Sequence, residues 1–116
     1  MITTVNMNPC IDRSVMVSDF QLSALNRVLE TRIDVCGKGV NVAAALKNLG
    51  SSSVCIGLNY SQNKEELENR LQTEGIPYEF VEVQGRIRTN IKVIDVKNHN
   101  LTEINERGGA VPAENL

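Results

Sequence analysis

The stretch Val35–Gly50, VCGKGVNVAAALKNLG, contains the pattern that decides the fold of this chain. Its second half predicts a helix from Val40 to Leu49, because consecutive alanines favour a helix and Gly50 supplies a stop signal. The helical period places four side chains on one face, which we expect to be buried: Val42, Ala45, Leu46 and Leu49. Ahead of the helix, a lysine between two glycines lies where backbone N–H groups and the helix dipole attract anions.

This Gly-Lys-Gly segment is not one of the common nucleotide-phosphate loops. A Walker loop, G-x-x-x-x-G-K-[ST], needs glycine at position 32 and a hydroxyl residue at position 39, where this chain has Arg32 and Gly39. The dinucleotide fingerprint fails as well. From the spacing alone two interpretations stay open, a plain connection from a loop to a helix or a loop that binds a ligand.

Around this stretch, strand and helix patterns alternate. The order is β-α-β-α-β, with connections long enough to cross over, so the sequence predicts a parallel sheet flanked by helices. The predicted strands are Ile2–Met7, Ser53–Leu58 and Tyr78–Val83, and the second predicted helix is Asn63–Glu74.

Four further segments do not fit that sheet. They are polar and alternating, so we expect a second, smaller sheet that covers the carboxyl ends of the parallel strands: 13–17, 28–35, 88–96 and 101–105. At the end of the chain, VPAENL (111–116) is typical of the first turn of a helix, and the sequence looks cut there.

Composition excludes several classes of protein. The chain has 116 residues and a net charge of −2, which predicts a single domain with no nucleic-acid partner. Cys10, Cys36 and Cys55 are too few and too widely spaced for a disulfide framework or structural zinc, so we expect reduced thiols. With no signal peptide and no apolar run of 18 residues, we expect a cytoplasmic protein that does not interact with a membrane.

Three polar positions converge in the predicted fold. Asp12 follows the carboxyl end of the first strand, 37–41 begins a helix, and Arg86 and Arg88 precede a strand of the second sheet. Together they could hold a sugar phosphate from three sides, because a carboxylate accepts hydrogen bonds from hydroxyls and arginine matches phosphate. Taken singly, Asp12 could equally be a turn residue and Arg88 a solvated strand residue.

Four segments resemble the N-terminal part of the ribokinase-like (PfkB) sugar kinases, within them the branch of bacterial 1-phosphofructokinases and tagatose-6-phosphate kinases. They are TVNMNPCIDRSV (4–15), LNRVLETRIDVCGKGVNVAAALKNLG (25–50), VQGRIRTNIKVID (83–95) and TEINERGG (102–109). The resemblance implies a three-layer α/β fold, incomplete here, with a β-sheet lid that often clasps a homodimer. It also implies transfer of a phosphoryl group from Mg-ATP to a sugar phosphate, of the type that converts fructose 1-phosphate to fructose 1,6-bisphosphate.

The same resemblance implies roles for eight residues in binding the acceptor. Asp12 matches the aspartate that binds sugar hydroxyls, a glycine-rich signature supplies further contacts, and two residues at the base of the lid lie near the substrate phosphate. The signature is Gly37, Lys38, Gly39 and Asn41, the pair is Arg88 with Asn90, and Arg27 is a further candidate for the phosphate.

Three departures from the family pattern matter. Cys36 stands where a small residue, commonly glycine, is usual, so a positive φ there would strain the loop. The segment 58–66, LNYSQNKEE, replaces a second glycine-rich turn. The Gly-Ala-Gly-Asp-like motif that carries the catalytic base, and the C-terminal ATP-binding half, are absent from 1–116, so we expect this chain alone to be inactive.

The leading hypothesis is therefore the acceptor-binding and lid portion of a sugar-phosphate kinase. One alternative is a non-catalytic module for sugar-phosphate binding or dimerisation. The other is a carbohydrate kinase of the same family with a different acceptor, such as tagatose 6-phosphate, an unphosphorylated sugar or a nucleoside.

Overall fold

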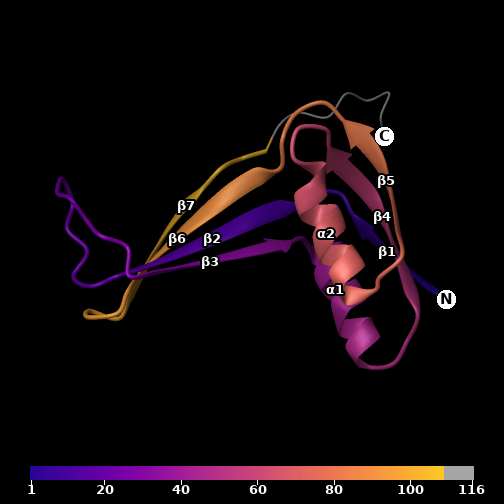
Figure 1. Ribbon diagram of the computed structural model, residues 1–116, viewed down its shortest axis with the longest axis horizontal. Coiled ribbons are helices and arrows are strands. Elements are labelled where there is room, and N and C mark those ends of the chain that lie inside the picture. The colour runs from indigo at the N-terminus through magenta and orange to yellow at the C-terminus, as the bar shows by residue number, and fades with distance from the viewer. Residues whose placement is uncertain (109–116) are drawn as a thin grey trace.

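Two sheets and two helices make up the chain in the computed structural model, which describes residues 1–108 (Figure 1). In order the elements are β1 (Ile2–Asn6), β2 (Cys10–Val17), β3 (Glu30–Cys36), α1 (Lys38–Asn48), β4 (Ser53–Tyr60), α2 (Lys64–Glu74), β5 (Tyr78–Val83), β6 (Arg88–Asp95) and β7 (Asn100–Asn105). The expectation for 111–116 falls outside the described residues. No helix within 1–108 is long and apolar enough to cross a membrane.

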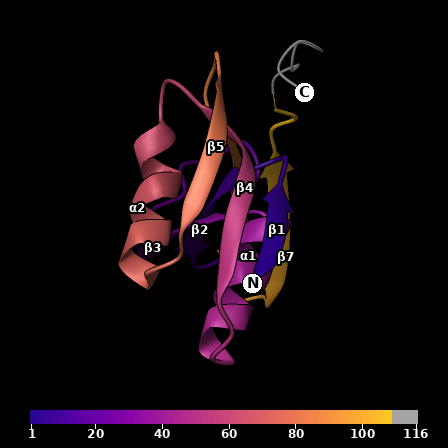
Figure 2. The same ribbon diagram turned by 90° about the vertical axis from the view of Figure 1, so that its right-hand side faces the viewer.

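The first sheet has the order β1-β4-β5 and is parallel throughout. The predicted β-α-β-α-β unit is confirmed, and both helices lie on the same side of this sheet (Figure 2). The opposite side exposes Val5, Ile56 and Val81. The predicted α/β fold class is confirmed.

The core of the molecule lies between the first sheet and its helices. Leu67 and Leu71 of α2 and Cys55 of β4 are fully buried there, together with Val40 of α1. Each buried aliphatic side chain of this size contributes about 1.5–3 kcal/mol through the apolar surface that it removes from water. The first sheet and the two helices are therefore held by an ordinary hydrophobic core.

The predicted buried face of α1 is wrong. Val42 is 51% exposed and Leu49 is 80% exposed, whereas Gly39, Val40 and Ala43 are buried. The reason is the close approach of the helix to β1, since a Cβ added to Gly39 would lie 2.4 Å from the carbonyl oxygen of Val5. Counting large apolar residues misses a face on which only small residues fit.

The second sheet has the order β3-β2-β6-β7, so the four segments predicted for it do pair with one another. β2 and β6 are parallel and the outer pairs are antiparallel. This sheet projects away from the helices (Figure 1). β2 begins at Cys10, earlier than predicted, so Asp12 lies within a strand and its interpretation as a turn residue is wrong.

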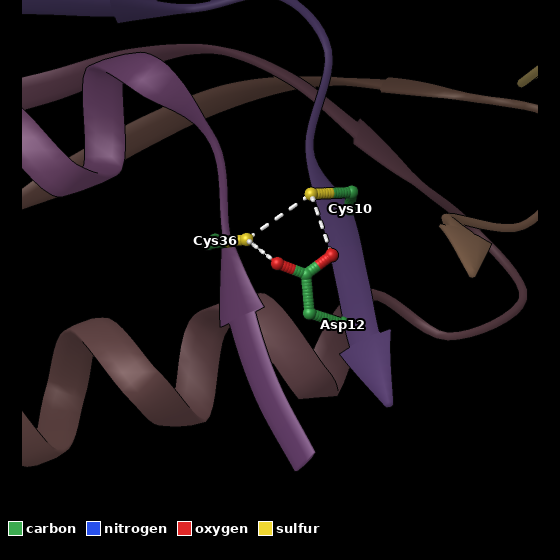
Figure 3. A group of neighbouring side chains, drawn as sticks. All are labelled: Cys10, Asp12 and Cys36. Carbon is green, nitrogen blue, oxygen red and sulfur yellow. Dashed lines mark hydrogen bonds between the residues drawn. The ribbon is translucent and has the colours of Figure 1, made fainter. Parts of the chain in front are cut away.

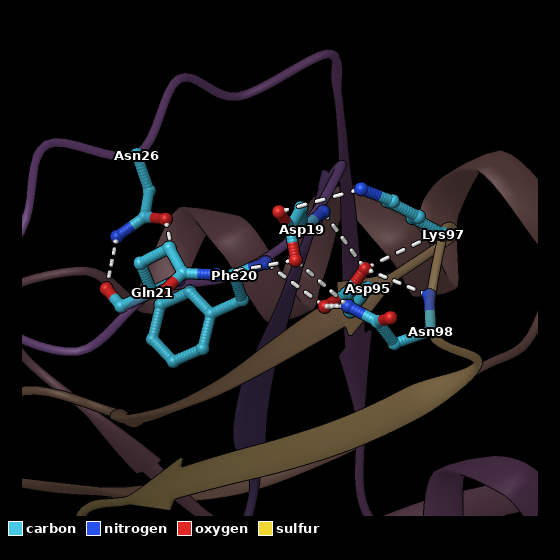
Figure 4. A network of polar contacts seen from close by, with 7 residues as sticks. All are labelled: Asp19, Phe20, Gln21, Asn26, Asp95, Lys97 and Asn98. Carbon is cyan, nitrogen blue, oxygen red and sulfur yellow. Dashed lines mark hydrogen bonds and ion pairs between the residues drawn. The ribbon is translucent and has the colours of Figure 1, made fainter.

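A carboxylate fastens the far end of the second sheet. Asp95, only 3% exposed, accepts hydrogen bonds from the backbone N–H groups of Asp19, Phe20, Lys97 and Asn98 and from the Asn98 side chain (Figure 4). The Asn98 amide and the backbone donors hold the pKa of Asp95 well below its usual range. One buried carboxylate thus joins the end of β2 to the turn between β6 and β7.

Candidate functional site

Asp12 lies at the centre of a polar cluster on the second sheet. Its strand, β2, is flanked by β3 and β6, and Asp12 pairs in register with Asp34 on one side and Asn90 on the other. The Asn90 amide donates to Asp12 Oδ1 at 3.2 Å, and Lys92 Nζ lies 3.7 Å from Asp12 Oδ2. The carboxylate is therefore oriented by an amide and partly neutralised by a cation.

Alternation along β6 places Arg88, Asn90 and Lys92 on the same face as Asp12. The Nε group of Arg88 and the Oδ1 atom of Asn90 are buried without a hydrogen-bond partner among the described residues. Buried polar atoms in proteins almost always have partners, so these two groups are available to a ligand that enters the face. The sequence did not single out Lys92, although it lies in the quoted segment RTNIK.

The structure explains why positions 37 and 39 of the Gly-Lys-Gly segment are glycines, which the sequence alone did not show. A Cβ on Gly37 would lie 2.2 Å from Asn6 Oδ1, and the N–H of Gly39 donates to the same oxygen at 3.2 Å. Asn6, at the carboxyl end of β1, is 2% exposed. Close packing against β1 therefore requires both glycines, whether or not a ligand also binds there.

Lys38 and Asn41 follow on the first turn of α1. Lys38 is exposed and makes no ion pair within the described part of the chain. Asn41 Oδ1 accepts a hydrogen bond from Arg70 of α2 at 3.1 Å, and the same guanidinium nitrogen donates to the carbonyl of Val35. Arg70 thus joins α2 to the end of β3 and the start of α1. The sequence around Arg70 indicates only an ion pair with Glu74, four residues later, and not this bridging role.

Two pockets lie beside the second sheet. One, of about 670 Å³, lies between β3 and α2 and is lined by Asp12, Cys36, Asn41 and Arg70 among others. The other, of about 750 Å³, is lined on its basic side by Arg86, Arg88 and Arg107. Each pocket is large enough for a small sugar phosphate.

Arg27 is a predicted site residue that the structure does not bring to this cluster. It is exposed in the segment between β2 and β3, beyond the pair Met16 and Glu30. Asp12 lies four residues back along β2 from Met16, which is about 13 Å at about 3.3 Å per residue, so Arg27 follows the end of the sheet that is remote from Asp12.

The structure shows the backbone at two of the positions where the sequence departs from the family pattern. Cys36 ends β3 and does not have a positive φ, so the backbone strain that a cysteine there predicted is absent. Only 61–63 of the segment 58–66 form a turn, because Leu58, Asn59 and Tyr60 continue β4 as buried residues and α2 begins at Lys64.

Cys10, Asp12 and Cys36 form a compact group on the edge of the 670 Å³ pocket (Figure 3). Burial, reinforced by Cys10 and Asp12, raises the pKa of the Cys36 thiol far above its usual value. Two sulfurs and one carboxylate do not suit Mg²⁺, which prefers oxygen ligands in an octahedral arrangement. Nothing in this group therefore supports a magnesium site.

The position and chemistry of this polar cluster are typical of a ligand-binding site in an open α/β protein. The polar cluster lies beyond the carboxyl end of β1, beside a parallel α/β sheet, which is where open α/β folds bind their ligands. Its carboxylate, amide and cationic groups suit a small ligand that carries both hydroxyls and negative charge.

Comparison with known proteins supplies the particular family. The sequence pattern of the pfkB family of carbohydrate kinases matches residues 5–115, and the chain belongs to this family. A 1-phosphofructokinase of Rhodobacter capsulatus is 35% identical over 114 residues, which cover 97% of this chain and 36% of the relative. The chain thus spans about a third of the length of the curated relatives that it matches.

Solved structures agree with that assignment. A Staphylococcus aureus protein assigned as a phosphofructokinase has a TM-score of 0.88 and 32% identity, covering 99% of this chain and 37% of its own. Phosphofructokinase-2 of Escherichia coli in complex with fructose-6-phosphate has a TM-score of 0.86 and 24% identity, covering 98% of this chain and 38% of its own, and it shows the shared fold. The same enzyme has also been solved as a tetrameric inhibited form.

Proposed function

We propose that this chain forms the acceptor-binding and lid portion of an ATP-dependent sugar-phosphate kinase, with fructose 1-phosphate as the acceptor. The observation that carries the proposal is the face shared by Asp12, Arg88, Asn90 and Lys92, on which two buried polar groups have no partner in the described chain. The curated relatives are 1-phosphofructokinases, which favours this acceptor over tagatose 6-phosphate.

Each group on this face has a role in the proposal. Asp12 accepts hydrogen bonds from sugar hydroxyls, and Asn90 and Lys92 hold its carboxylate in position. Arg88 binds the acceptor phosphate, because its guanidinium matches phosphate in both charge and geometry. Asn41 lines the 670 Å³ pocket together with Asp12, Gly37 and Gly39 let the start of α1 lie close to β1, and Lys38 adds positive charge at the start of α1.

The phosphoryl donor, we propose, is Mg-ATP. A pfkB-family kinase uses a nucleoside triphosphate, and phosphoryl transfer is catalysed mainly by positioning and by stabilising charge at the transferred group. No described residue of this chain is proposed to hold the metal or to act as the catalytic base. This chain would supply only the acceptor side of the reaction, in a protein with the length of its relatives.

Arg27 fits the proposal through a second copy of the chain. It lies in the segment beyond the Met16 and Glu30 pair, at the end of the second sheet that is remote from Asp12. We propose that two copies pack through their second sheets, so that Arg27 of one copy approaches the acceptor phosphate of the other. The exposed Ile33 and Ile104 lie in one cross-strand row on the face of that sheet opposite Asp12, and they give such a dimer its apolar contact.

The test is calorimetric titration of the full chain with fructose 1-phosphate, tagatose 6-phosphate and fructose. We expect fructose 1-phosphate to bind most tightly and Asp12→Asn or Arg88→Ala to weaken it about tenfold to a hundredfold, as for hydrogen bonds to charged groups. Lys47→Ala is the matched control, since Lys47 is an exposed cation on α1 that lines neither of the two pockets beside the second sheet.

Unchanged affinity in both site variants would refute the assignment of this face. Tighter binding of fructose than of fructose 1-phosphate would favour the family alternative with an unphosphorylated acceptor. Tight fructose 1-phosphate binding without phosphoryl transfer from Mg-ATP in the full-length protein would instead indicate a non-catalytic binding module.

A further inference from the structure

We propose that Cys10 and Cys36 are a redox-sensitive pair that forms a disulfide beside Asp12 on oxidation by hydrogen peroxide. The proposal rests first on the register of the second sheet. Cys10 begins β2 and Cys36 ends β3, and the two residues face each other directly across this antiparallel pair. Directly opposed residues of antiparallel strands have Cα atoms about 4.5–5.5 Å apart, which falls within the range that disulfides span.

The side chains complete the geometry. The two Sγ atoms are 3.1 Å apart, and both cysteines are free (Figure 3). A disulfide needs these atoms to approach by about 1 Å, a movement that side-chain rotation can supply. Two sulfurs on one tetrahedral Zn²⁺ ion would lie about 3.8 Å apart instead, so the pair is already too close for a relaxed zinc site.

Of the two cysteines, only Cys36 lines the pocket. Cys10 is 6% exposed, whereas Cys36 is half-buried and lines the 670 Å³ pocket together with Asp12. A small oxidant can therefore reach the sulfur of Cys36 from the pocket. Cys55, the third cysteine, is fully buried in β4 of the other sheet and has no access of this kind.

The chemistry proceeds in two balanced steps. The Cys36 thiolate attacks one peroxide oxygen, the O–O bond breaks, and the departing hydroxide takes a proton to become water, which leaves Cys36 as a sulfenic acid. The Cys10 sulfur then attacks the Cys36 sulfur, an S–S bond forms, the S–O bond breaks, and the hydroxide leaves with the Cys10 proton as a second water. Overall the two thiols lose two electrons and two protons to peroxide.

Disulfide formation would change the hydrogen bonds that Asp12 accepts. Cys36 donates its S–H to Asp12 Oδ2 at 3.3 Å, and Cys10 donates to Asp12 Oδ1 at 3.8 Å. A disulfide has no S–H, so oxidation replaces two donors by sulfur lone pairs facing a carboxylate. The attraction that holds Asp12 becomes repulsion, and the carboxylate moves toward Asn90 and Lys92.

This consequence rests on the proposed function, because it matters for the acceptor only if Asp12 binds sugar hydroxyls. Oxidation should then weaken fructose 1-phosphate binding by about tenfold, the effect of losing charged hydrogen bonds. Bound fructose 1-phosphate should in turn shift the equilibrium of the pair toward the two reduced thiols by the same factor, because linkage is reciprocal.

The experiment treats the full chain with hydrogen peroxide, blocks the remaining thiols, and maps the disulfide by peptide mass spectrometry under non-reducing conditions. We expect a Cys10–Cys36 linkage with a mass loss of two hydrogens, reversed by dithiothreitol, with Cys55 alkylated only after denaturation. The rate of disulfide formation should rise with pH, because the raised pKa of Cys36 keeps the Cys36 thiolate scarce at neutral pH. Cys55→Ala is the matched control and should form the same linkage.

Recovery of Cys36 as sulfinic acid with Cys10 still a free thiol would overturn the proposal, as would a disulfide that involves Cys55. Mapping on the unsubstituted chain needs no variant to fold. A Cys10–Cys36 linkage that leaves binding of fructose 1-phosphate unchanged would remove the effect on Asp12 and keep the redox pair. If the chain binds no sugar phosphate in either redox state, the proposed function fails while the mapped linkage stands by itself.

Discussion

The two sheets of this chain are stabilised in different ways. The first sheet and its helices enclose a continuous set of buried apolar side chains, including Leu67, Leu71 and Val40. In the second sheet Val17 and Val93 are buried, whereas Leu101 and Ile104 are exposed, and much of its cohesion comes from strand pairing and from polar contacts around Asp12 and Asp95. The comparison teaches that apolar burial is concentrated around the first sheet, whereas the polar cluster proposed to bind the acceptor lies on the second.

The largest expected effect comes from the closest contact near the first sheet. Gly57 has a φ of 144°, and a Cβ there would lie 1.9 Å from the carbonyl oxygen of Asn6. Gly57→Ala should lower the free energy of unfolding by about 4 kcal/mol, the sum of backbone strain and steric overlap. Urea denaturation measures it.

Gly50→Ala is the control for that substitution. Gly50 also has a positive φ, 82°, but nothing lies within 4 Å of its added Cβ. It should cost only the backbone term, about 1 kcal/mol. Equal losses for the two glycines would contradict the close packing of β4 against β1.

A matched pair of leucines tests the comparison directly. Leu67→Ala removes a fully buried side chain from the first core and should cost about 3 kcal/mol. Leu101→Ala, on β7 with the side chain 61% exposed, should change the free energy of unfolding by less than about 0.5 kcal/mol. A loss at Leu101 as large as that at Leu67 would mean that the second sheet carries a core of its own.

Arg70 tests the connection between the two regions. Arg70→Ala removes the hydrogen bonds to Val35 and Asn41 and should cost about 1–2 kcal/mol in urea denaturation. Glu74→Ala is the control, because it removes the exposed helix pair with Arg70 and leaves the other two bonds intact. Its effect should be at most about 0.5 kcal/mol, and an equal effect of both variants would exclude a bridging role for Arg70.

The smallest expected effect depends on pH and concerns the far end of the second sheet. The pKa of Asp95 is lowered in the folded chain, so its stabilising contribution is present above the unfolded value near pH 4 and is lost as pH falls below it. Hydrogen exchange should show the Asp19 and Phe20 amides losing protection progressively from about pH 4 down to about pH 2, with less change in Asp95→Asn. Constant protection across that range would show that Asp95 does not fasten this end.

The sequence predicted most of the elements because their signals are local. Proline after β1, glycine after each helix and the change from a period of two to 3.6 residues place every described strand and helix within a few residues. The buried face of α1 was mispredicted because it depends on how closely the helix approaches β1. That distance is a tertiary property, and Gly39 shows it only once Val5 is in place.

The contacts within the candidate site could not be predicted from local signals, because they join residues that are distant in the chain. Asp12 and Asn90 are 78 positions apart in sequence, and their hydrogen bond follows from the pairing of β2 with β6. The resemblance assigned both residues to acceptor binding, but neither it nor the spacing predicted this pairing. Asn6, Arg70 and Lys92 were missed because each acts through a partner distant in the chain. The Cys10 and Cys36 pair likewise becomes visible only through the register of β2 and β3.

The most direct test of the central claim is a titration of isotope-labelled full chain with fructose 1-phosphate, followed by amide chemical shifts. The account predicts the largest shifts at Asp12, Arg88 and Asn90 on the second sheet, with little change at Val5 and Val81 on the open face of the first. Shifts confined to that open face, or no shift at a saturating concentration of fructose 1-phosphate, would contradict it.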